Sequence, residues 1–425
     1  MNHPQTDSTK QYQISIPATL RARITLPASK SISNRALILN ALASRSQGDG
    51  AMASPLVNLS DCDDTRVMVE ALNGLPSHID IGAAGTAMRF LTALLATTPG
   101  ERLITGSERM RQRPIRLLVD ALRQLGASIR YRGEEGFPPL SVQGRQLEGG
   151  ELEMAGHVSS QYISALLMIA PTLNRGLRLR LTGEMISRPY IEMTLGMMRD
   201  FGASVSWQGP VIDVAPTGYQ RRPYRVESDW SAASYWFEMM ALTDDAEARL
   251  VLPGLDEQSR QGDAVVREIF RPLGVHADFR DGDLVLTKGS APVSRLEYDF
   301  VNCPDLAQTV VVCCAVMGTH FRFTGLQSLK IKETDRIVAL QTELRKLGYV
   351  VGSRNDNELY WEGERCEPQA HPAIDTYADH RMAMAFAPAA LRHKVVSIAD
   401  PAVVSKSYPK FWDHLRSVGF SIEEC

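Results

Sequence analysis

Basic and hydroxyl side chains at the start of a predicted helix are the first sign of chemistry in this sequence. Lys30, Ser31 and Arg35 lead into the apolar run of residues 36–43. The first backbone N–H groups of a helix have no partner within it, and the helix dipole favours an anion there. Two cations beside hydroxyl groups at such a place indicate a phosphate or carboxylate site. A capped surface helix with solvated basic residues would give the same local pattern.

Similar polar positions recur in the first half of the chain. Gly85 would let the backbone approach a ligand closely. Arg113 precedes a helix, where a cation is unfavourable for the dipole, so a bound anion explains it better than solvation does. Ser187 precedes Arg188 and Pro189 and repeats the arrangement of residues before a proline. Three more side chains offer hydroxyl or amide donors, which N-capping explains equally well: Ser159, Ser160 and Gln161.

The second half of the chain carries denser patterns. Asp305 lies at a predicted helix start, where N-capping is the alternative explanation. Lys332 and Arg336 are spaced i, i+4, which predicts one helical face. Glu333 lies between them, so cationic neighbours would set its pKa and its proton transfers. A solvated, charged helix start would be the alternative for this segment.

Two further cations complete the candidate set. Arg381 follows Asp379 and His380 and leads directly into a core helix, where charged groups are costly unless they are used. Lys406 precedes a helix that Pro409 helps to begin. Cations gathered at helix starts in a chain of net charge −3 indicate small, multiply charged anions as ligands. The carboxylates among them suit general acid and base catalysis.

Length and composition exclude several classes of protein. At 425 residues, with 44% hydrophobic and 22% charged residues, the chain is typical of a globular protein of two domains. Its net charge gives no support for a nucleic-acid or membrane-surface partner. The six cysteines form no CxxC pair and the chain has no signal-peptide pattern, so we expect a reducing cytoplasm and no structural metal. Walker A, GxGxxG, HExxH and GxSxG motifs are absent.

The candidate residues follow a repeated pattern. Apolar runs led by small or polar residues begin near Lys30, Gly85, Ser159, Trp230, Pro304 and Asp379. Their separations are 55, 74, 71, 74 and 75 residues, and a near-constant period indicates a repeated structural unit. We predict about six copies of helix, strand, helix and strand pair, with three copies in each of two domains. Accidental similarity among ordinary α/β segments is the alternative, and the regular spacing argues against it.

Several separate motifs together resemble the EPSP synthase family, also called 3-phosphoshikimate 1-carboxyvinyltransferase. They lie, in the family's order, at residues 26–35, 84–89, 113–114, 158–161, 332–336 and 379–384. The resemblance covers the chain from about residue 13 onward. It implies the two-domain α/β enolpyruvyl-transferase fold, an inside-out α/β barrel with six βαβαββ repeats, three per domain. The domains would be residues 1–28 with 228–425, and the inserted residues 29–227, with the active site in the cleft between them.

The resemblance also implies a reaction. The enolpyruvyl group of phosphoenolpyruvate would pass to the 5-hydroxyl of 3-phosphoshikimate and release phosphate, a step of the shikimate pathway to chorismate and aromatic amino acids. The family needs no metal or organic cofactor. We expect a cytoplasmic monomer that binds neither nucleic acid nor membrane. Gly85 is unsubstituted, so we expect glyphosate to compete with phosphoenolpyruvate.

The resemblance assigns a role to each candidate residue. The residues that would hold 3-phosphoshikimate are Lys30, Ser31, Arg35, Ser159, Ser160, Gln161, Ser187, Asp305 and Lys332. Those that would hold phosphoenolpyruvate are Lys30, Gly85, Arg113, Gln161, Arg336, Arg381 and Lys406. Asp305 would take the proton of the attacking hydroxyl. Glu333, assisted by Lys332, would protonate the enol methylene and later remove that proton, with Lys30 and Lys406 as alternative proton carriers.

Departures from the family pattern and one rival family complete the sequence evidence. Ala83 replaces a common amide, Ala28 stands where Gly is usual, and Ser328 replaces an amide of some members. These differences bear on substrate affinity and inhibitor sensitivity. The rival UDP-N-acetylglucosamine enolpyruvyltransferase uses a loop cysteine as an acid, and residues 109–113 contain none. A non-catalytic repeat scaffold is the other alternative, but it gives no reason for the clustered charges.

Overall fold

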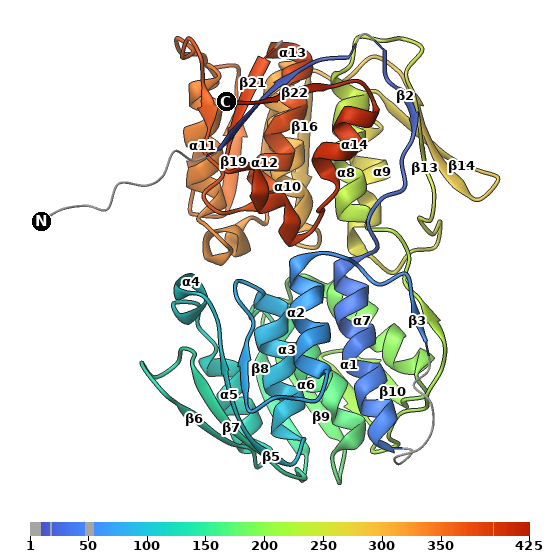
Figure 1. Cartoon of the computed structure of the whole chain (residues 1–425), viewed down its shortest axis with the longest axis vertical. Coiled ribbons are helices and arrows are strands. Elements are labelled where there is room, and N and C mark those ends of the chain that lie inside the picture. The colour runs from blue at the N-terminus through green and yellow to red at the C-terminus, as the bar shows by residue number, and fades with distance from the viewer. Residues whose placement is uncertain (1–9, 18, 47–54, 394) are drawn as a thin grey trace, which may run out of the picture. The chain divides into compact units, whose positions relative to one another are not determined.

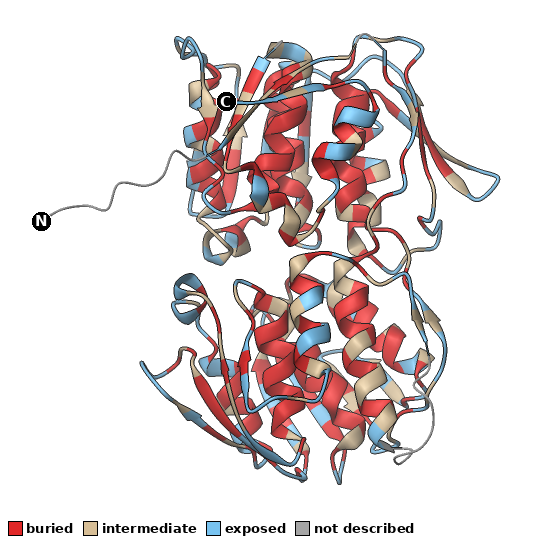
Figure 2. Ribbon diagram, viewed as in Figure 1, coloured by how far each residue is buried: buried red, intermediate tan, exposed pale blue. Residues whose placement is uncertain are grey.

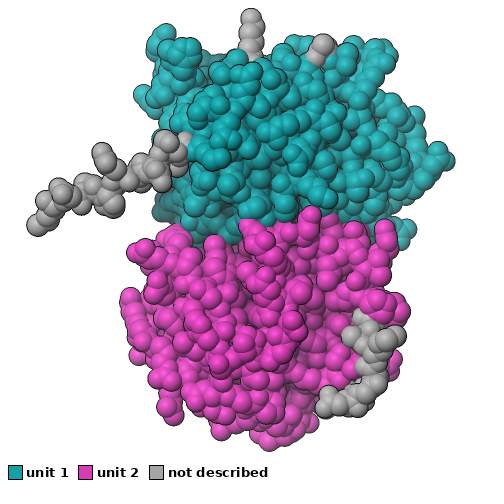
Figure 3. All heavy atoms as spheres, in the orientation of Figure 1, with its two compact units in different colours: residues 1–27, 228–425 teal, residues 28–227 magenta. Residues whose placement is uncertain are grey.

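A computed structural model describes residues 10–17, 19–46, 55–393 and 395–425. The chain divides into two compact units, coloured separately in Figure 3. Unit 1 comprises Met1–Pro27 and Ser228–Cys425, and unit 2 comprises Ala28–Glu227. Each unit has its own hydrophobic core of buried residues. The candidate residues are therefore described for each unit in turn.

Unit 2 is built around helices that are buried along most of their length. Its core helices α3 (Gly85–Ala96) and α6 (Ser160–Ile169) pack against each other and appear almost wholly buried in Figure 2. Small and apolar residues at nearly every position leave them no polar face, which is the composition of a fully enclosed helix. The surrounding helices are α1 (Lys30–Ser46), α2 (Asp63–Leu72), α4 (Glu108–Arg111), α5 (Arg116–Gln124) and α7 (Arg188–Asp200).

The sheets of unit 2 cover this helical core. In β9 (Leu177–Thr182), leucines are buried and alternate with exposed arginines, so one face of the strand packs inward. One four-stranded sheet has the order β4 (His78–Asp80), β5 (Gly100–Thr105), β7 (Leu140–Gly144), β6 (Ser128–Tyr131). The second has the order β10 (Val205–Gln208), β11 (Val211–Val214), β9, β8 (Gly150–Ala155). A short parallel pair joins β12 (Tyr224–Arg225) to β3 (Leu56–Val57).

Unit 1 repeats this construction with its own buried helices. Asp229 caps α8 (Trp230–Leu242) by accepting from the Ala232 N–H at 2.8 Å. Helix α10 (Ala307–Met317) ends at Gly318, whose φ of 80° is the left-handed conformation that commonly closes a helix. Figure 1 shows α8, α10 and α12 in this unit. The other helices are α9 (Val266–Phe270), α11 (Arg336–Lys346), α12 (His380–Phe386), α13 (Ala390–His393) and α14 (Phe411–Ser417).

Three four-stranded sheets belong to unit 1. The first has the order β14 (Val275–Arg280), β15 (Asp283–Lys288), β13 (Arg249–Leu252), β2 (Arg21–Arg23). The second has the order β16 (Arg295–Asp299), β17 (His320–Thr324), β19 (Glu358–Trp361), β18 (Gly352–Arg354). The third has the order β20 (Ala373–Ile374), β21 (Val395–Ala399), β1 (Gln11–Ser15), β22 (Ser421–Glu424).

The N-terminal segment belongs to unit 1 because it completes two of these sheets. Strand β1 lies between β21 and β22 and pairs antiparallel with both, while β2 pairs in parallel with β13. Backbone hydrogen bonds accompany both chain crossings. The Asp229 N–H donates to Pro27 O at 2.9 Å within unit 1, and the Ser29 N–H donates to Glu227 O at 2.8 Å within unit 2. Within each unit, a backbone hydrogen bond thus joins two segments that are far apart in sequence.

A buried carboxyl group in α8 predicts a pH-dependent stability. Glu238 is fully buried, and burial raises its pKa well above the ordinary value of 4.5. At a given pH above 4.5, Glu238 therefore binds more protons in the folded protein than in the unfolded chain. Its contribution to the free energy of unfolding is complete below pH 4.5 and is lost as the pH rises through the raised pKa. We expect Glu238→Met to raise the melting temperature more at pH 8 than at pH 5, by about 2–4 °C for each kcal/mol regained.

Thermal unfolding of the wild-type chain and of Glu238→Met, each at pH 5 and at pH 8, tests this expectation. Glu423→Met is the matched control, because Glu423 is exposed on β22 of the same unit. An equal change in melting temperature at pH 5 and pH 8 for Glu238→Met would contradict it.

Candidate functional site

In unit 2, the first residue of α1 carries a paired cation. Lys30 Nζ lies 3.0 Å from Asp64 Oδ2, and Asp64 belongs to the first turn of α2. The Asp64 side chain is buried, and that of Lys30 is mostly covered. Asp64 was not among the residues singled out from the sequence. The three aspartates at residues 61, 63 and 64, at the start of α2, are the signal that could have identified it.

Arg35 contacts residues of three helices in unit 2. It is only 3% exposed and donates from Nε to Thr194 Oγ1 of α7 at 2.7 Å and from Nη2 to Ser164 Oγ of α6 at 3.2 Å. Its Nη1 donates to Ser31 O in α1 at 2.9 Å. Burial lowers the pKa of Arg35 to about 10, which leaves it charged at neutral pH. Arg35 thus fixes α1 against α6 and α7.

The N-terminal turns of α3 and α6 lie side by side. Gln161 Nε2 donates to Thr86 Oγ1 at 3.2 Å, and the guanidinium of Arg89 lies over the Tyr162 ring. The helix that Arg113 precedes is α5, which begins at Arg116 with Ile115 as its N-cap. These contacts place donors from two helix N-termini next to each other.

Gly85 leaves room for a basic side chain. A Cβ at residue 85 would lie 2.7 Å from Arg113 Nη1, which is closer than real Cβ contacts. The absence of a side chain at Gly85 therefore allows the Arg113 guanidinium to rest on the first residue of α3. Two candidates that are distant in sequence are brought together by this contact.

The hydroxyl candidates of unit 2 take different positions. Ser159 is the N-cap of α6 and accepts from the Gln161 N–H at 3.4 Å, so the capping explanation holds for it. Ser160 is the first residue of that helix. Ser187 is the N-cap residue of α7 in a left-handed conformation, with a φ of 55°. Such a backbone is uncommon outside glycine and marks a conformation imposed by its surroundings.

In unit 1, one arginine contacts three carboxylates. Arg336, the first residue of α11, is 1% exposed. Its Nε lies 2.7 Å from Asp379 Oδ2, its Nη1 3.3 Å from Asp305 Oδ1 and its Nη2 3.0 Å from Glu333 Oε2. Burial alone would lower the pKa of Arg336, but Asp379, Glu333 and Asp305 together raise it. This arginine is the centre of a charged network.

Asp305 receives two further cations. Arg381 Nη2 lies 2.9 Å from Asp305 Oδ2, and Lys332 Nζ lies 3.5 Å from Asp305 Oδ1. The expectation that Lys332 and Arg336 share one helical face is wrong, because Lys332 follows the 3₁₀ helix Gln327–Ile331 and α11 begins only at Arg336. Both nevertheless contact Asp305.

Glu333 is paired with two cations from different segments. Lys406 Nζ lies 3.0 Å from Glu333 Oε1, and Arg336 Nη2 contacts the other carboxylate oxygen. Lys406 ends a 3₁₀ turn, Pro401–Lys406, and is buried. The geometry therefore offers Lys406 as a cation that can serve Glu333, in addition to the Lys332 expected from the resemblance.

Sequence reasoning missed a buried acid near Asp305. Ser231 Oγ donates to Asp263 Oδ2, and Asp263 is 3% exposed. Burial, and secondarily the charge of Asp305, raise the pKa of Asp263 to about 7. A group with such a pKa can hold or lose a proton near neutral pH. The Gln261–Gly262–Asp263 turn carried no recognisable signal in a single sequence.

The unit 1 network can bind an anion and move protons. It contains four cations, Lys332, Arg336, Arg381 and Lys406, and three carboxylates, Asp305, Glu333 and Asp379. Carboxylates held by cations in a partly buried site are suited to general acid and base catalysis, and the cations are suited to a phosphate or carboxylate ligand.

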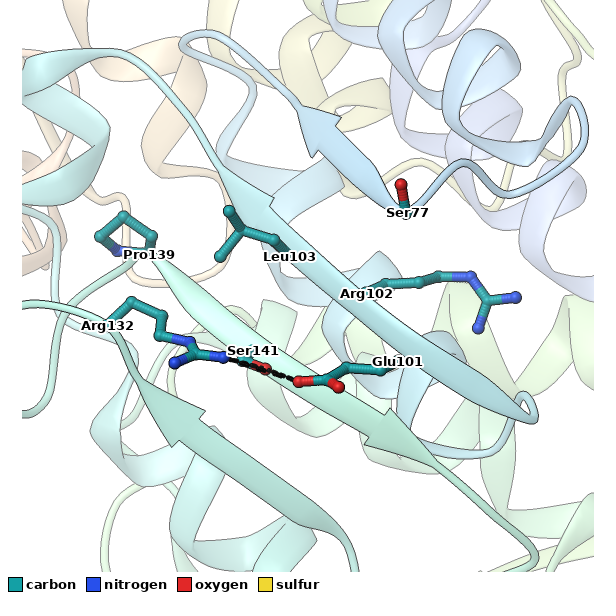
Figure 4. A pocket seen from close by; sticks show the side chains of 7 residues that line it. All are labelled: Ser77, Glu101, Arg102, Leu103, Arg132, Pro139 and Ser141. Carbon is teal, nitrogen blue, oxygen red and sulfur yellow. Dashed lines mark hydrogen bonds and ion pairs between the residues drawn. The ribbon is translucent and has the colours of Figure 1, made fainter.

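Two surface pockets lie away from the candidate residues. One, of about 500 Å³, lies on the β4–β5–β7–β6 sheet and is lined by residues that include Glu101, Arg132 and Ser141 (Figure 4). Ser141 Oγ donates to Glu101 Oε1 at 2.8 Å there.

In the described part of the chain, no group of three or more His, Cys, Asp or Glu residues could hold a metal ion. None of the helices described is both long and apolar enough to cross a bilayer.

Comparison with solved structures defines the class of fold. EPSP synthase from Acinetobacter baumannii superposes with a TM-score of 0.77 at 24% identity, covering 98% of this chain and 100% of that one. A second structure of the enzyme from the same organism gives a TM-score of 0.75 at 23% identity, covering 97% and 99%. The chain therefore has the α/β enolpyruvyl-transferase fold.

Sequence comparison defines the family. The family model described as EPSP synthase (3-phosphoshikimate 1-carboxyvinyltransferase) matches residues 14–80 and 74–415. A Bacteroides fragilis protein named 3-phosphoshikimate 1-carboxyvinyltransferase is 57% identical over 414 residues, covering 97% of this chain and 99% of that protein. A protein of the same name from Idiomarina loihiensis is 38% identical over 424 residues, covering 92% and 95%. The chain belongs to the EPSP synthase family and is a transferase of this kind.

Proposed function

We propose that the chain transfers the enolpyruvyl group of phosphoenolpyruvate to the 5-hydroxyl of 3-phosphoshikimate, giving 5-enolpyruvylshikimate 3-phosphate and phosphate. This reaction is a step of the shikimate pathway to chorismate and the aromatic amino acids. The observation that carries the proposal is the unit 1 network, in which Asp305 and Glu333 are each paired with cations. The chemistry needs two proton carriers beside an anion site, and this network supplies both.

We assign the two ligands to residues of both units. For 3-phosphoshikimate these are Lys30, Ser31, Arg35, Ser159, Ser160, Gln161, Ser187, Asp305 and Lys332. For phosphoenolpyruvate these are Lys30, Gly85, Arg113, Gln161, Arg336, Arg381 and Lys406. The Arg113 guanidinium resting on Gly85 supports an anion site there, because arginine binds carboxylate and phosphate through two parallel hydrogen bonds. Arg35 is enclosed by Ser164 and Thr194, so its part is to hold the binding helices together as well as to attract the anion.

Each proton transfer is given to a named carboxylate. The oxygen of the 5-hydroxyl attacks the phosphate-bearing carbon of phosphoenolpyruvate, and Asp305 accepts the proton of that hydroxyl. At the same time, Glu333 donates a proton to the methylene carbon of phosphoenolpyruvate. A tetrahedral adduct forms, in which the cations stabilise the phosphate group. Glu333 then removes a proton from the methyl group, the C–O bond to phosphate breaks, the phosphate leaves with the proton that Asp305 had accepted, and the carbon–carbon double bond returns. Lys406 at 3.0 Å from Glu333 assists these transfers, and Lys30 attracts both anions.

We also propose the larger arrangement that this chemistry requires. The fold would consist of six βαβαββ units, three in each domain, with domains of residues 1–28 plus 228–425 and 29–227. The active site would form in the cleft between the domains, since residues of both are assigned to the same ligands. We expect a cytoplasmic monomer.

Phosphate release tests the proposed function directly. The purified chain is mixed with 3-phosphoshikimate and phosphoenolpyruvate, and inorganic phosphate is measured over time. Phosphate is expected only when both substrates are present, and glyphosate is expected to slow its release at low phosphoenolpyruvate. A rate that does not depend on 3-phosphoshikimate would overturn the assignment. Turnover unchanged by millimolar glyphosate would overturn the inhibitor proposal alone.

A methyl group at Gly85 is expected to weaken phosphoenolpyruvate binding. In Gly85→Ala the new Cβ would lie 2.7 Å from Arg113 Nη1, so the guanidinium must move. Loss of one charge-assisted hydrogen bond is expected to raise the KM for phosphoenolpyruvate about tenfold. The KM for 3-phosphoshikimate is expected to stay within about twofold, because the clash involves only Arg113. Steady-state kinetics measure both, and Gly133→Ala is the control, since a Cβ at Gly133 would meet Pro139 Cδ at an ordinary contact distance of 3.7 Å.

A further inference from the structure

A strained turn directly precedes the charged residues of unit 1. The Asp379 N–H donates to Thr376 O at 2.8 Å and closes a turn over Tyr377 and Ala378. The φ angles of these two central residues are 54° and 53°. Positive φ at both central positions is the pattern of a type I′ turn, which favours Asn and Gly. Tyr and Ala carry a Cβ that is unfavourable there, so the surroundings must hold the turn in place.

Helix α11 provides the group that holds this turn. Glu343 is fully buried and accepts from Tyr377 Oη at 2.6 Å and from the Asp375 N–H at 3.0 Å. Lys346 Nζ lies 2.7 Å from Glu343 Oε2 and 2.8 Å from Asp375 Oδ2. Glu343 therefore contacts Tyr377 within the turn through Oε1 and Asp375 before the turn through Oε2, and Lys346 neutralises its charge.

The same helix also holds the C-terminal side of the turn. Arg336, at the start of α11, binds the Asp379 carboxylate through Nε at 2.7 Å and Nη2 at 3.2 Å. Arg336 and Glu343 are separated by about two helical turns, or roughly 10 Å. Asp379 Oδ1 also accepts from the Arg381 N–H at 2.9 Å. The turn is thus fixed at two points of one rigid element, and its exit sets the place of Asp379.

We propose that Glu343 and Tyr377 are positioning residues that hold the left-handed turn, and through Asp379 set the orientation of Arg336 and Arg381 for the anionic substrate. They act on the reaction through the turn. The kinetic part of this inference rests on the proposed function, because Arg336 and Arg381 are assigned there to phosphoenolpyruvate. The structural part concerns only the turn and can be measured without substrate.

Tyr377→Phe tests the contact while keeping the ring. The tyrosine is 40% exposed, so the variant is expected to fold. Losing a hydrogen bond to a charged acceptor is expected to speed amide exchange in the peptide of residues 375–386 about tenfold. The KM for phosphoenolpyruvate is expected to rise by a similar factor, while the KM for 3-phosphoshikimate stays within about twofold. Hydrogen exchange by mass spectrometry and steady-state phosphate release measure these effects.

A second substitution distinguishes positioning from direct contact. Glycine adopts positive φ without strain, so Ala378→Gly lowers the energy of the turn itself. Added to Tyr377→Phe, it is expected to return both the exchange rate and the KM to within about threefold of wild type. A tyrosine that touched substrate directly would not be rescued in this way. Tyr349→Phe is the control, because it removes a Tyr349–His393 hydrogen bond of 3.0 Å elsewhere in unit 1.

Each result decides the inference. Unchanged amide hydrogen exchange in Tyr377→Phe overturns the proposal that Glu343 and Tyr377 hold the turn, whatever the activity. Faster exchange with an unchanged KM for phosphoenolpyruvate overturns the positioning role. Failure of Ala378→Gly to rescue excludes the turn as the route. If the wild-type chain released no phosphate, the proposed function would fail, and the exchange measurements would still decide whether Glu343 and Tyr377 hold the turn.

Discussion

Arg336→Met is expected to destabilise unit 1 by about 3–5 kcal/mol, because removing one partner of a buried ion pair leaves its counter-charges uncompensated. Arg336 is 1% exposed and contacts Asp379, Asp305 and Glu333 at 2.7 to 3.3 Å. Without it, three carboxylates would repel one another in a largely buried place. The rate of phosphate release is expected to fall at least about 10³-fold. The substitution removes a guanidinium that can bind the anionic substrate through two hydrogen bonds, and it also disturbs the positions of the proton carriers Asp305 and Glu333.

Urea unfolding and steady-state kinetics measure the two effects separately. Arg295→Met is the matched control, because Arg295 also contacts two carboxylates, Glu297 at 2.9 Å and Glu362 at 2.7 Å, but its side chain is 39% exposed. An exposed pair contributes little, so the control is expected to change stability by less than about 1 kcal/mol. Arg336→Lys is expected to lose most activity as well, because one ammonium group cannot reproduce the guanidinium fork. Equal stability losses in Arg336→Met and Arg295→Met would contradict this account.

Glu333→Gln is expected to lower kcat by about 10²–10⁴-fold, the usual contribution of a general acid or base. Glutamine keeps the shape of the side chain, but its amide cannot donate and recover a proton at the methylene carbon. Arg336 would retain Asp379 and Asp305, so we expect the fold to survive. The KM values are expected to change much less than kcat, because the lost interaction belongs to the transition state.

Steady-state phosphate release, with both substrates varied, gives kcat and the two KM values. Glu297→Gln is the control, because Glu297 is an exposed carboxylate that also pairs with an arginine. A kcat for Glu333→Gln within threefold of wild type would shift the proton transfers to another group. Lys30 and Lys406 would then be the next residues to replace, since Lys406 contacts the same carboxylate at 3.0 Å.

The sequence by itself determined the family and the reaction class, and it predicted most of the charged side chains that the structure joins in the unit 1 network. Charged and hydroxyl residues at the starts of apolar helices are costly to bury, so their positions stand out without a structure. Local signals also placed the buried helices, because nearly uniform apolar composition identifies α3, α6 and α10. The i, i+4 spacing of Lys332 and Arg336 predicted a single helix, but α11 begins only at Arg336.

Only the tertiary structure decided which charges meet. Three contacts join residues that are between 32 and 43 positions apart in sequence: Lys30 with Asp64, Ser231 with Asp263, and Arg336 with Asp379. A carboxylate becomes functional through the burial and the counter-charges that long-range packing brings to it, and no local pattern records these. The turn at Tyr377 and Ala378 illustrates the same limit. Its left-handed backbone contradicts local preference and persists because Glu343 of a different element holds it.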